Sequence, residues 1–265
     1  MWCFMHFINK TLNKFDLALT RRSRIAATEQ QLKEINKTKA IMKYFAVDFV
    51  VSVGSACRTA FYLREAGLRQ CTNPLDWMYR YSLNSVLDLF KTEFNSFFVD
   101  VEDITPPKES QDRHIRDKTT GMISLHDFSQ ANSINDELES FHKNMERRFR
   151  RMQKCILLSD KVLFVCNRQD SEESLLSFIT SVYEMYKVPC VLLNIRHSTE
   201  LSGYFVKNIN NDITFIEYTF NDIHADGSDP IINKCFWHGN KSLWIPIMNT
   251  ITISNKLNSF IRDFQ

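Results

Sequence analysis

Glycine and paired cysteines are scarce in this sequence, and their scarcity excludes several kinds of site. Only 6 of the 265 residues are glycine, and neither the G-x-G-x-x-G fingerprint of dinucleotide-binding turns nor the P-loop pattern occurs. The seven cysteines form no C-x-x-C pair, which excludes a zinc ribbon and a thioredoxin-type redox motif. The sequence therefore predicts neither a metal site nor a bound cofactor.

Long apolar runs and a strong net charge are also absent. No stretch approaches the roughly 18–20 apolar residues that a membrane-spanning helix needs, and the first residues lack the basic region and cleavage site of a secretory signal. The formal net charge is +2, so the overall charge does not favour nucleic acid as a partner. Scattered cysteines in an odd number fit a reducing compartment. We expect a soluble, cytoplasmic protein.

The sequence does contain an alternation of strand-like and helix-like segments. The best strand-like segments are continuous apolar runs, as in "KVLFVCNR" and "VPCVLLNI", which is typical of a parallel sheet covered on both faces. The sequence predicts an α/β fold with a mostly parallel sheet sandwiched by helices, in a flavodoxin-like or SGNH-hydrolase-like arrangement. Strands are expected at 45–55, 96–104, 122–128, 161–168, 188–195 and 212–220, helices at 56–67, 82–94, 133–159 and 171–187, and a loop at 105–121.

The first 45 residues differ in character from the rest. Their central part is charged, rich in strong helix formers and free of glycine and proline. We expect residues 1–45 to form a helical N-terminal extension, a candidate for peripheral contact with a membrane or a partner protein. Residues 46–265 are expected to form a single α/β domain that carries the functional site.

A cysteine stands where the first buried strand turns into a helix, in "VSVGSACRTAFYLREAG" from Val51 to Gly67. Unpaired N–H groups and the helix dipole favour an anion at such a position, so the pKa of the Cys57 thiol is expected to fall. The same N–H groups can hold an oxyanion, and the small residues Gly54, Ser55 and Ala56 let the backbone turn closely. A structural cysteine and a cradle for a phosphate ligand remain open alternatives.

A cysteine nucleophile requires a base and a group that orients the base. His126 in "MISLHDF" is expected at the end of a strand, on the functional edge of the sheet, and His197 after "VLLNI" is its rival. Asp76, between apolar neighbours in "NPLDWM", and Asp127 are candidates for the third group. Neighbouring side chains on a strand point to opposite faces, which argues against Asp127 as the partner of His126. Asp76 has the alternative role of closing the turn after Pro74.

These motifs together resemble one known family. "VSVGSACRTAFYLREAGLRQCTNPLDWM", followed by "SLHDF", "ERRFRRM" and "KVLFVCNR", is similar to a bacterial family of putative papain-like cysteine peptidases, a domain of unknown function, over about residues 47–245. The resemblance implies Cys57 as nucleophile and His126 as base, with Asp76 or Asp127 as the acidic member. This sequence departs from the family pattern at Ser55-Ala56, where asparagine is common, and at Leu75, where phenylalanine is common.

Three functions therefore stand open. The first is a cysteine peptidase or amidase acting on an acyl or peptide bond. The second is a cysteine acyltransferase or esterase in capsule or surface-polysaccharide biosynthesis, with a glycan-linked small-molecule substrate. The third is a non-catalytic protein that binds a nucleotide-sugar or coenzyme A through Arg58, Arg148 and neighbouring arginines, with Trp77 available to stack on a ring. Glutamates at 137, 139 and 146 favour a solvent-exposed surface for the arginine-rich helix over such a site.

Overall fold

The computed structural model describes residues 18–33, 45–107 and 112–264. Within these ranges the largest sheet has the strand order β2-β7-β8-β10-β9. Neighbours in the series β2, β7, β8 and β10 run parallel, and β9 is an antiparallel edge strand. The bounds are Phe49–Ser52 for β2, Val162–Cys166 for β7, Cys190–His197 for β8, Gly203–Asn208 for β9 and Ile213–Phe220 for β10.

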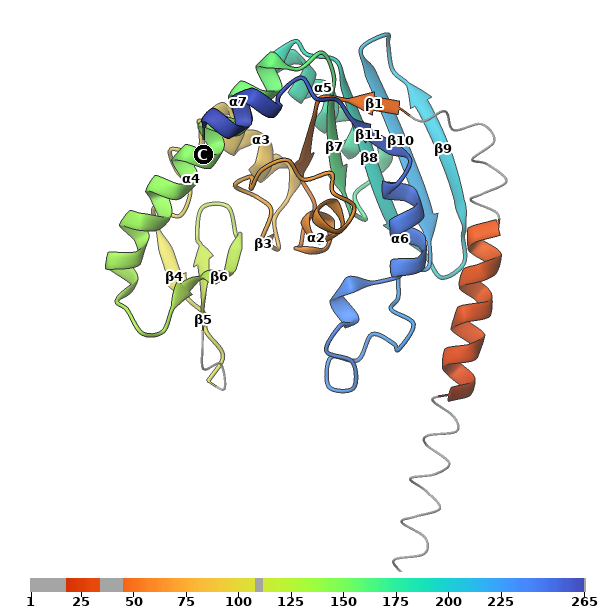
Figure 1. The fold of residues 1–265 in the computed structure, drawn as a ribbon. Coiled ribbons are helices and arrows are strands. Elements are labelled where there is room, and N and C mark those ends of the chain that lie inside the picture. The colour runs from red at the N-terminus through yellow and green to blue at the C-terminus, as the bar shows by residue number, and fades with distance from the viewer. Residues whose placement is uncertain (1–17, 34–44, 108–111, 265) are drawn as a thin grey trace, which may run out of the picture.

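Helices cover both faces of this sheet (Figure 1). One face packs on α3 (Leu83–Lys91), α4 (Ile134–Leu158), α5 (Glu172–Tyr186) and the terminal α7 (Asn258–Asp263). The other face packs on α2 (Arg58–Glu65) and α6 (Lys241–Met248). The expected α/β layering with helices on both sides is confirmed for this sheet, because its apolar strands bury side chains in both directions.

The predicted helix boundaries follow from local capping. Ser82, Ser133 and Ser171 each accept a hydrogen bond from the backbone N–H three residues later, at the starts of α3, α4 and α5. The segment after α2 leaves the helix at Gly67, whose φ of +69° favours glycine. The sequence located these four helices correctly because serine caps, the glycine after α2 and apolar periodicity are local signals.

An antiparallel sheet is inserted between β2 and β7, with the order β3-β6-β5-β4. Its strands are β3 (Met78–Tyr79), β4 (Val101–Asp103), β5 (Asp112–Asp117) and β6 (Ile123–Ser129). A mostly parallel fold is therefore not confirmed, since the described sheets include a mixed and an antiparallel one, and neither is the flavodoxin-like arrangement. The expected loop at 105–121 is also wrong, because the charged segment 112–117 pairs with β6.

The expected strand at 45–55 is two strands. β1 (Phe45–Val47) pairs with β11 (Ile251–Ile253), and β2 joins the main sheet. Asp48 separates them, and its carboxylate accepts hydrogen bonds from the backbone N–H of Asp160 at 2.6 Å and from the Ser254 hydroxyl. This residue therefore joins the start of β2, the turn before β7 and the segment after β11.

The N-terminal extension is described over a helix at 18–33, and the rest of 1–44 lies outside the described residues. The helix contacts the segment after β10, through an ion pair between Arg21 and Asp226 at 2.9 Å and a hydrogen bond from Asn240 to Thr28. Phe45 already belongs to β1, and the division into extension and domain stays a prediction. In the part of the chain that the structure describes, every helix is too short or too polar to cross a membrane.

Candidate active site

Cys57 is the N-cap residue of α2, directly after the turn that follows β2. Gly54 makes this turn possible, because a Cβ at that position would lie 2.3 Å from the buried hydroxyl of Thr59. A residue from another segment also stabilises the turn: the backbone N–H of Arg80, just after β3, donates to the carbonyl of Ser55 at 2.9 Å. Ser55 and Ala56 are half-buried between these anchors. The predicted placement of a cysteine at a strand-to-helix turn is confirmed.

The N-terminus of α2 is left without a side-chain cap. The Ser caps of α3, α4 and α5 each satisfy a first-turn N–H group, whereas no described side chain does so for α2. First-turn N–H groups beside a cysteine are the arrangement that holds an oxyanion in acyl transfer. The structure therefore keeps the donors that the sequence predicted.

The state of the thiol differs from the prediction. Cys57 is half-buried, and its Sγ donates to the carbonyl of Trp77 at 3.6 Å. Burial raises the pKa of Cys57 to about 11; its own backbone N–H opposes this effect, and the Asp127 carboxylate adds to it. The expected fall in pKa is wrong, because desolvation outweighs the local N–H groups. The thiol is protonated at neutral pH and needs a base in order to react.

Asp76 is a buried carboxylate in the loop that contacts Cys57 through Trp77. Its Oδ2 accepts from the backbone N–H of Asn73 at 2.9 Å and lies 3.4 Å from the guanidinium of Arg69. Its Oδ1 has no hydrogen-bond partner among the described residues. Burial raises the pKa of Asp76 to about 6, and the Asn73 N–H and the nearby arginines oppose the shift. Asp76 therefore closes the turn and is also poorly solvated.

Asp127, next to His126 on β6, is close enough for its charge to influence the Cys57 thiol. Its carboxylate accepts from the Ser124 hydroxyl at 2.7 Å, and it acts on both Cys57 and Arg148. Burial lowers the pKa of Arg148, while the carboxylates of Asp127 and Asp76 oppose that effect. The structure therefore brings Cys57, Asp76, Asp127 and Arg148 into one electrostatic neighbourhood.

Within the residues that the structure describes, His126 forms no hydrogen bond or ion pair with Cys57, Asp76, Asp127 or Arg148. Its side chain is 60% exposed, and its Nδ1 lies 3.8 Å from the Asp112 carboxylate on β5. No hydrogen bond links Cys57 to a histidine within the described ranges. His126 also lies inside β6 rather than at a strand end, so its expected place on the edge of the parallel sheet is wrong. The sequence missed Asp112 because it falls in the segment expected to be a loop.

His197, the rival base, is engaged elsewhere. Its Nδ1 accepts a hydrogen bond from the backbone N–H of Asp222 at 3.0 Å. This interaction lies at the ends of β8 and β10, where it fixes the chain that follows the sheet. In the ranges that the structure describes, no group of three or more His, Cys, Asp or Glu side chains is arranged to hold a metal ion.

Arg58 is bound within the protein. Its Nε donates to the carbonyl of Trp237 at 2.6 Å, and its Nη1 lies 2.5 Å from the fully buried carboxylate of Asp222. Asp222 also accepts from the indole N–H of Trp244 at 2.9 Å and from the backbone N–H of Asn240 at 2.8 Å. This partly buried ion pair connects the start of α2 to the segment after β10. The sequence missed it because Asp222 is 164 residues away from Arg58.

Two further arginines and Trp77 shape the turn around Cys57. The half-buried Trp77 ring lies against the guanidinium groups of Arg64 and Arg69, at 5.4 and 5.6 Å. Arg168, which the sequence did not single out, is buried and donates through Nε to the carbonyl of Val53 at 3.0 Å. The end of β2 is therefore fixed from the end of β7. Roles in substrate binding for Gly54, Ser55, Ala56, Arg58, Trp77 and Arg148 stay predictions.

Comparison with known proteins gives one family. A family model described as "Putative papain-like cysteine peptidase (DUF1796)" matches residues 48–188, which is 141 of the 265 residues. The matched range begins at Asp48 and includes Cys57, Asp76, His126 and Asp127. No curated protein and no solved structure matches the chain.

Proposed function

Because the chain belongs to the family described as putative papain-like cysteine peptidases, we propose that it is a cysteine-dependent hydrolase of peptide or other amide bonds, with Cys57 as the nucleophile. The observation that carries this proposal is a half-buried free thiol at the uncapped N-terminus of α2. At this position the nucleophile lies next to the first-turn N–H groups that can donate to an oxyanion.

The reaction begins from a protonated thiol, since the pKa of Cys57 is about 11. The Sγ–H proton passes to the base as Sγ forms a bond to the substrate carbonyl carbon, and the carbonyl oxygen becomes an oxyanion held by first-turn N–H groups of α2. The C–N bond then breaks, and the base returns the proton to the leaving amine. Water, deprotonated by the same base, hydrolyses the thioester and restores the thiol.

We assign the base to His126, oriented by the carboxylate of Asp112. The 3.8 Å separation of His126 Nδ1 from Asp112 supports this pairing, in place of the expected partners Asp76 and Asp127. The assignment requires the exposed imidazole to turn from its resting position toward Cys57 when substrate binds. Asp127 has a different effect in this scheme: burial is the main reason that the pKa of Cys57 is raised, and the Asp127 charge adds to it.

Transfer of the acyl group to a second nucleophile, as in the acyltransferase or esterase alternative, uses the same first step. The two outcomes differ in what resolves the thioester. Trapping the acyl-enzyme and supplying water or a sugar hydroxyl distinguishes them, and the Cys57 assignment holds for either.

The proposal is tested with a peptidyl electrophile and a panel of fluorogenic peptide and amide substrates. We expect the electrophile to modify Cys57, and Cys57→Ser to abolish both labelling and turnover. Cys235→Ser is the matched control, because Cys235 is an exposed free thiol outside this site. His126→Gln should lower kcat by about two orders of magnitude or more, whereas His114→Gln on the neighbouring strand should not. Turnover that survives Cys57→Ser refutes the proposal.

A further inference from the structure

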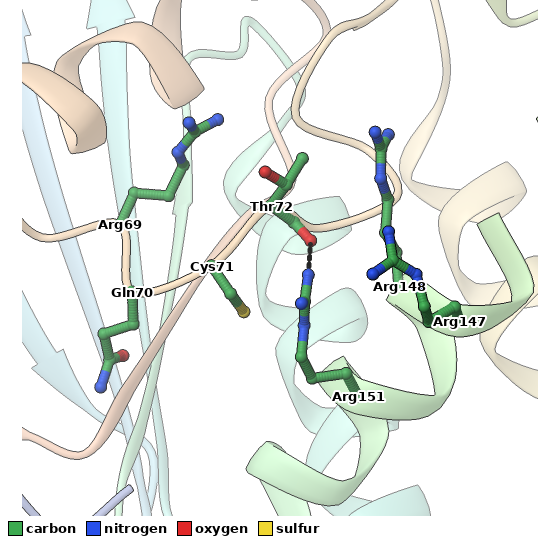
Figure 2. A pocket seen from close by; sticks show the side chains of 7 residues that line it. All are labelled: Arg69, Gln70, Cys71, Thr72, Arg147, Arg148 and Arg151. Atoms are coloured by element: carbon green, nitrogen blue, oxygen red, sulfur yellow. Dashed lines mark hydrogen bonds between the residues drawn. The ribbon is translucent and has the colours of Figure 1, made fainter. Parts of the chain in front are cut away.

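A cavity of about 260 Å³ lies between α4 and the segment that joins α2 to β3, and four arginines line it. Arg147, Arg148 and Arg151 come from α4, and Arg69 comes from the joining segment. Figure 2 shows Arg151 reaching from α4 to the chain at 69–72, where it donates to the carbonyl of Thr72. Four guanidinium groups around one small cavity repel one another unless an anion lies between them.

The arginines facing the cavity differ from the other cations of α4. On the exposed surface of the helix, Arg150 is paired with Glu146 at 2.5 Å and Lys143 with Glu139 at 2.6 Å, each at i,i+4 spacing. Arg147, Arg148 and Arg151 follow the spacing of a single helix face, and none forms an ion pair with a described carboxylate. The expectation of a solvent-exposed, self-neutralised helix is therefore correct for Lys143 and Arg150, which are exposed and paired, and wrong for Arg151, which is buried.

Arg151 is the most constrained of the four. Its side chain is buried, with the residue only 5% exposed. Its Nη2 donates to the carbonyl of Thr72 at 2.7 Å, but its buried Nε has no partner among the described residues. A buried cation with a free donor is costly for the folded protein unless a further group satisfies it.

The local charges leave a surplus of positive charge. Arg69 is offset by Asp76 at 3.4 Å, and Asp127 acts on Arg148. Four arginines against two carboxylates leave a net +2. We propose that this cavity is a binding site for a phosphate group. The planar guanidinium group of arginine can donate two parallel hydrogen bonds to two oxygens of one phosphate. A phosphate dianion would neutralise the net charge of +2, whereas a single carboxylate would neutralise only half of it.

The size of the cavity limits the ligand. At about 260 Å³ it falls just below the roughly 300–1,000 Å³ of pockets that enclose a whole small molecule. It therefore suits a phosphate or diphosphate head, with the rest of the ligand outside. Arg58, once expected to share this role, is engaged by Asp222 and takes no part. The proposal goes beyond the hydrolase function, because it uses none of the atoms of the Cys57 thiol.

The test is calorimetric titration of the full-length protein with inorganic phosphate, pyrophosphate and acetate, in sodium chloride adjusted to equal ionic strength so that general screening is constant. We expect saturable 1:1 binding of pyrophosphate or phosphate that is at least about tenfold tighter than binding of acetate. Arg147→Gln and Arg148→Gln should each weaken it by about tenfold or more. Arg150→Gln is the matched control on the same helix and should change the Kd by less than about twofold.

Arg151→Gln removes the buried donor, so its melting temperature is measured first, and the exposed Arg147 provides the decisive variant if Arg151→Gln does not fold. Cys57→Ala should bind pyrophosphate like the unaltered protein, which separates this proposal from the hydrolase function. The proposal is overturned if phosphate and pyrophosphate do not saturate a site, if acetate binds equally well, or if Arg150→Gln weakens binding as much as Arg147→Gln.

Discussion

Asp76 should make the protein less stable as the pH rises through the mildly acidic range, which is opposite to the usual behaviour of a salt-bridged aspartate. Its pKa is about 6 in the folded protein, against 3.8 for an ordinary aspartate, chiefly because the carboxylate is buried. The unfolded chain therefore loses this proton first, and stability falls between about pH 4 and pH 6. At about 1.4 kcal/mol per pH unit, the ionised carboxylate costs the folded state about 3 kcal/mol at pH 8.

Asp76→Asn removes this charge and keeps an oxygen that can accept from the Asn73 N–H. The variant also buries an amide beside Arg69, which adds a contribution independent of pH. We therefore predict the change with pH rather than the absolute difference: the unfolding free energy of the variant, relative to the unaltered protein, should be about 2.5 kcal/mol higher at pH 8 than at pH 4. Urea unfolding across this range measures it.

The matched control is Asp88→Asn, which removes an exposed carboxylate from α3 and is measured over the same pH range. A constant difference for Asp76→Asn, within about 1 kcal/mol, would refute the argument that the carboxylate is desolvated. The same variant reports on function. If Asp76 serves only the fold and the arginine cavity, Asp76→Asn keeps its hydrolytic turnover.

Three further predictions follow from other contacts. Burial alone would raise the pKa of Asp48, but its hydrogen bonds lower it, so Asp48→Asn should cost about 1–3 kcal/mol at pH 7 and progressively less as urea unfolding is repeated toward pH 3. Gly54→Ala should lower stability by about 1–3 kcal/mol, because its Cβ meets the Thr59 hydroxyl; adding Thr59→Ala should restore part of the loss in thermal unfolding. Alkylation of Cys57 by iodoacetamide, followed by peptide mass spectrometry, should be slow at pH 7 and accelerate toward pH 11, and Asp127→Asn should speed it at pH 8; fast alkylation at pH 7 would contradict the raised pKa.

The elements that could be predicted from the sequence are those whose signal is local. β7 is five buried apolar residues in a row, and α4 begins at a serine cap, so both are evident from a short window. β5 and β9 carry charged or exposed residues and exist because a neighbouring strand supplies their hydrogen bonds. That partner is not visible within the segment itself.

The candidate site likewise has features that the local sequence predicts and features that depend on distant segments. The position of Cys57 was predictable because Gly54 and the start of α2 are adjacent in the chain. Its pKa was not, because the burial of the thiol depends on parts of the chain that are distant in sequence, such as the loop carrying Trp77, whose carbonyl accepts from Sγ. The sequence alone likewise leaves Arg58 available for a ligand, because the carboxylate that binds it comes from a distant segment.

The insertion of the antiparallel sheet between β2 and β7 affects when the site can form. Asp48 bonds to the backbone of Asp160, 112 residues later, and Arg168 fixes the carbonyl of Val53 across 115 residues. Contacts of such long range form late in folding, because a large loop must close first. During synthesis, the cysteine turn emerges long before the strand that holds it in place. We therefore expect the turn that carries Cys57 to be held in place only after α4 and β7 have been made and docked.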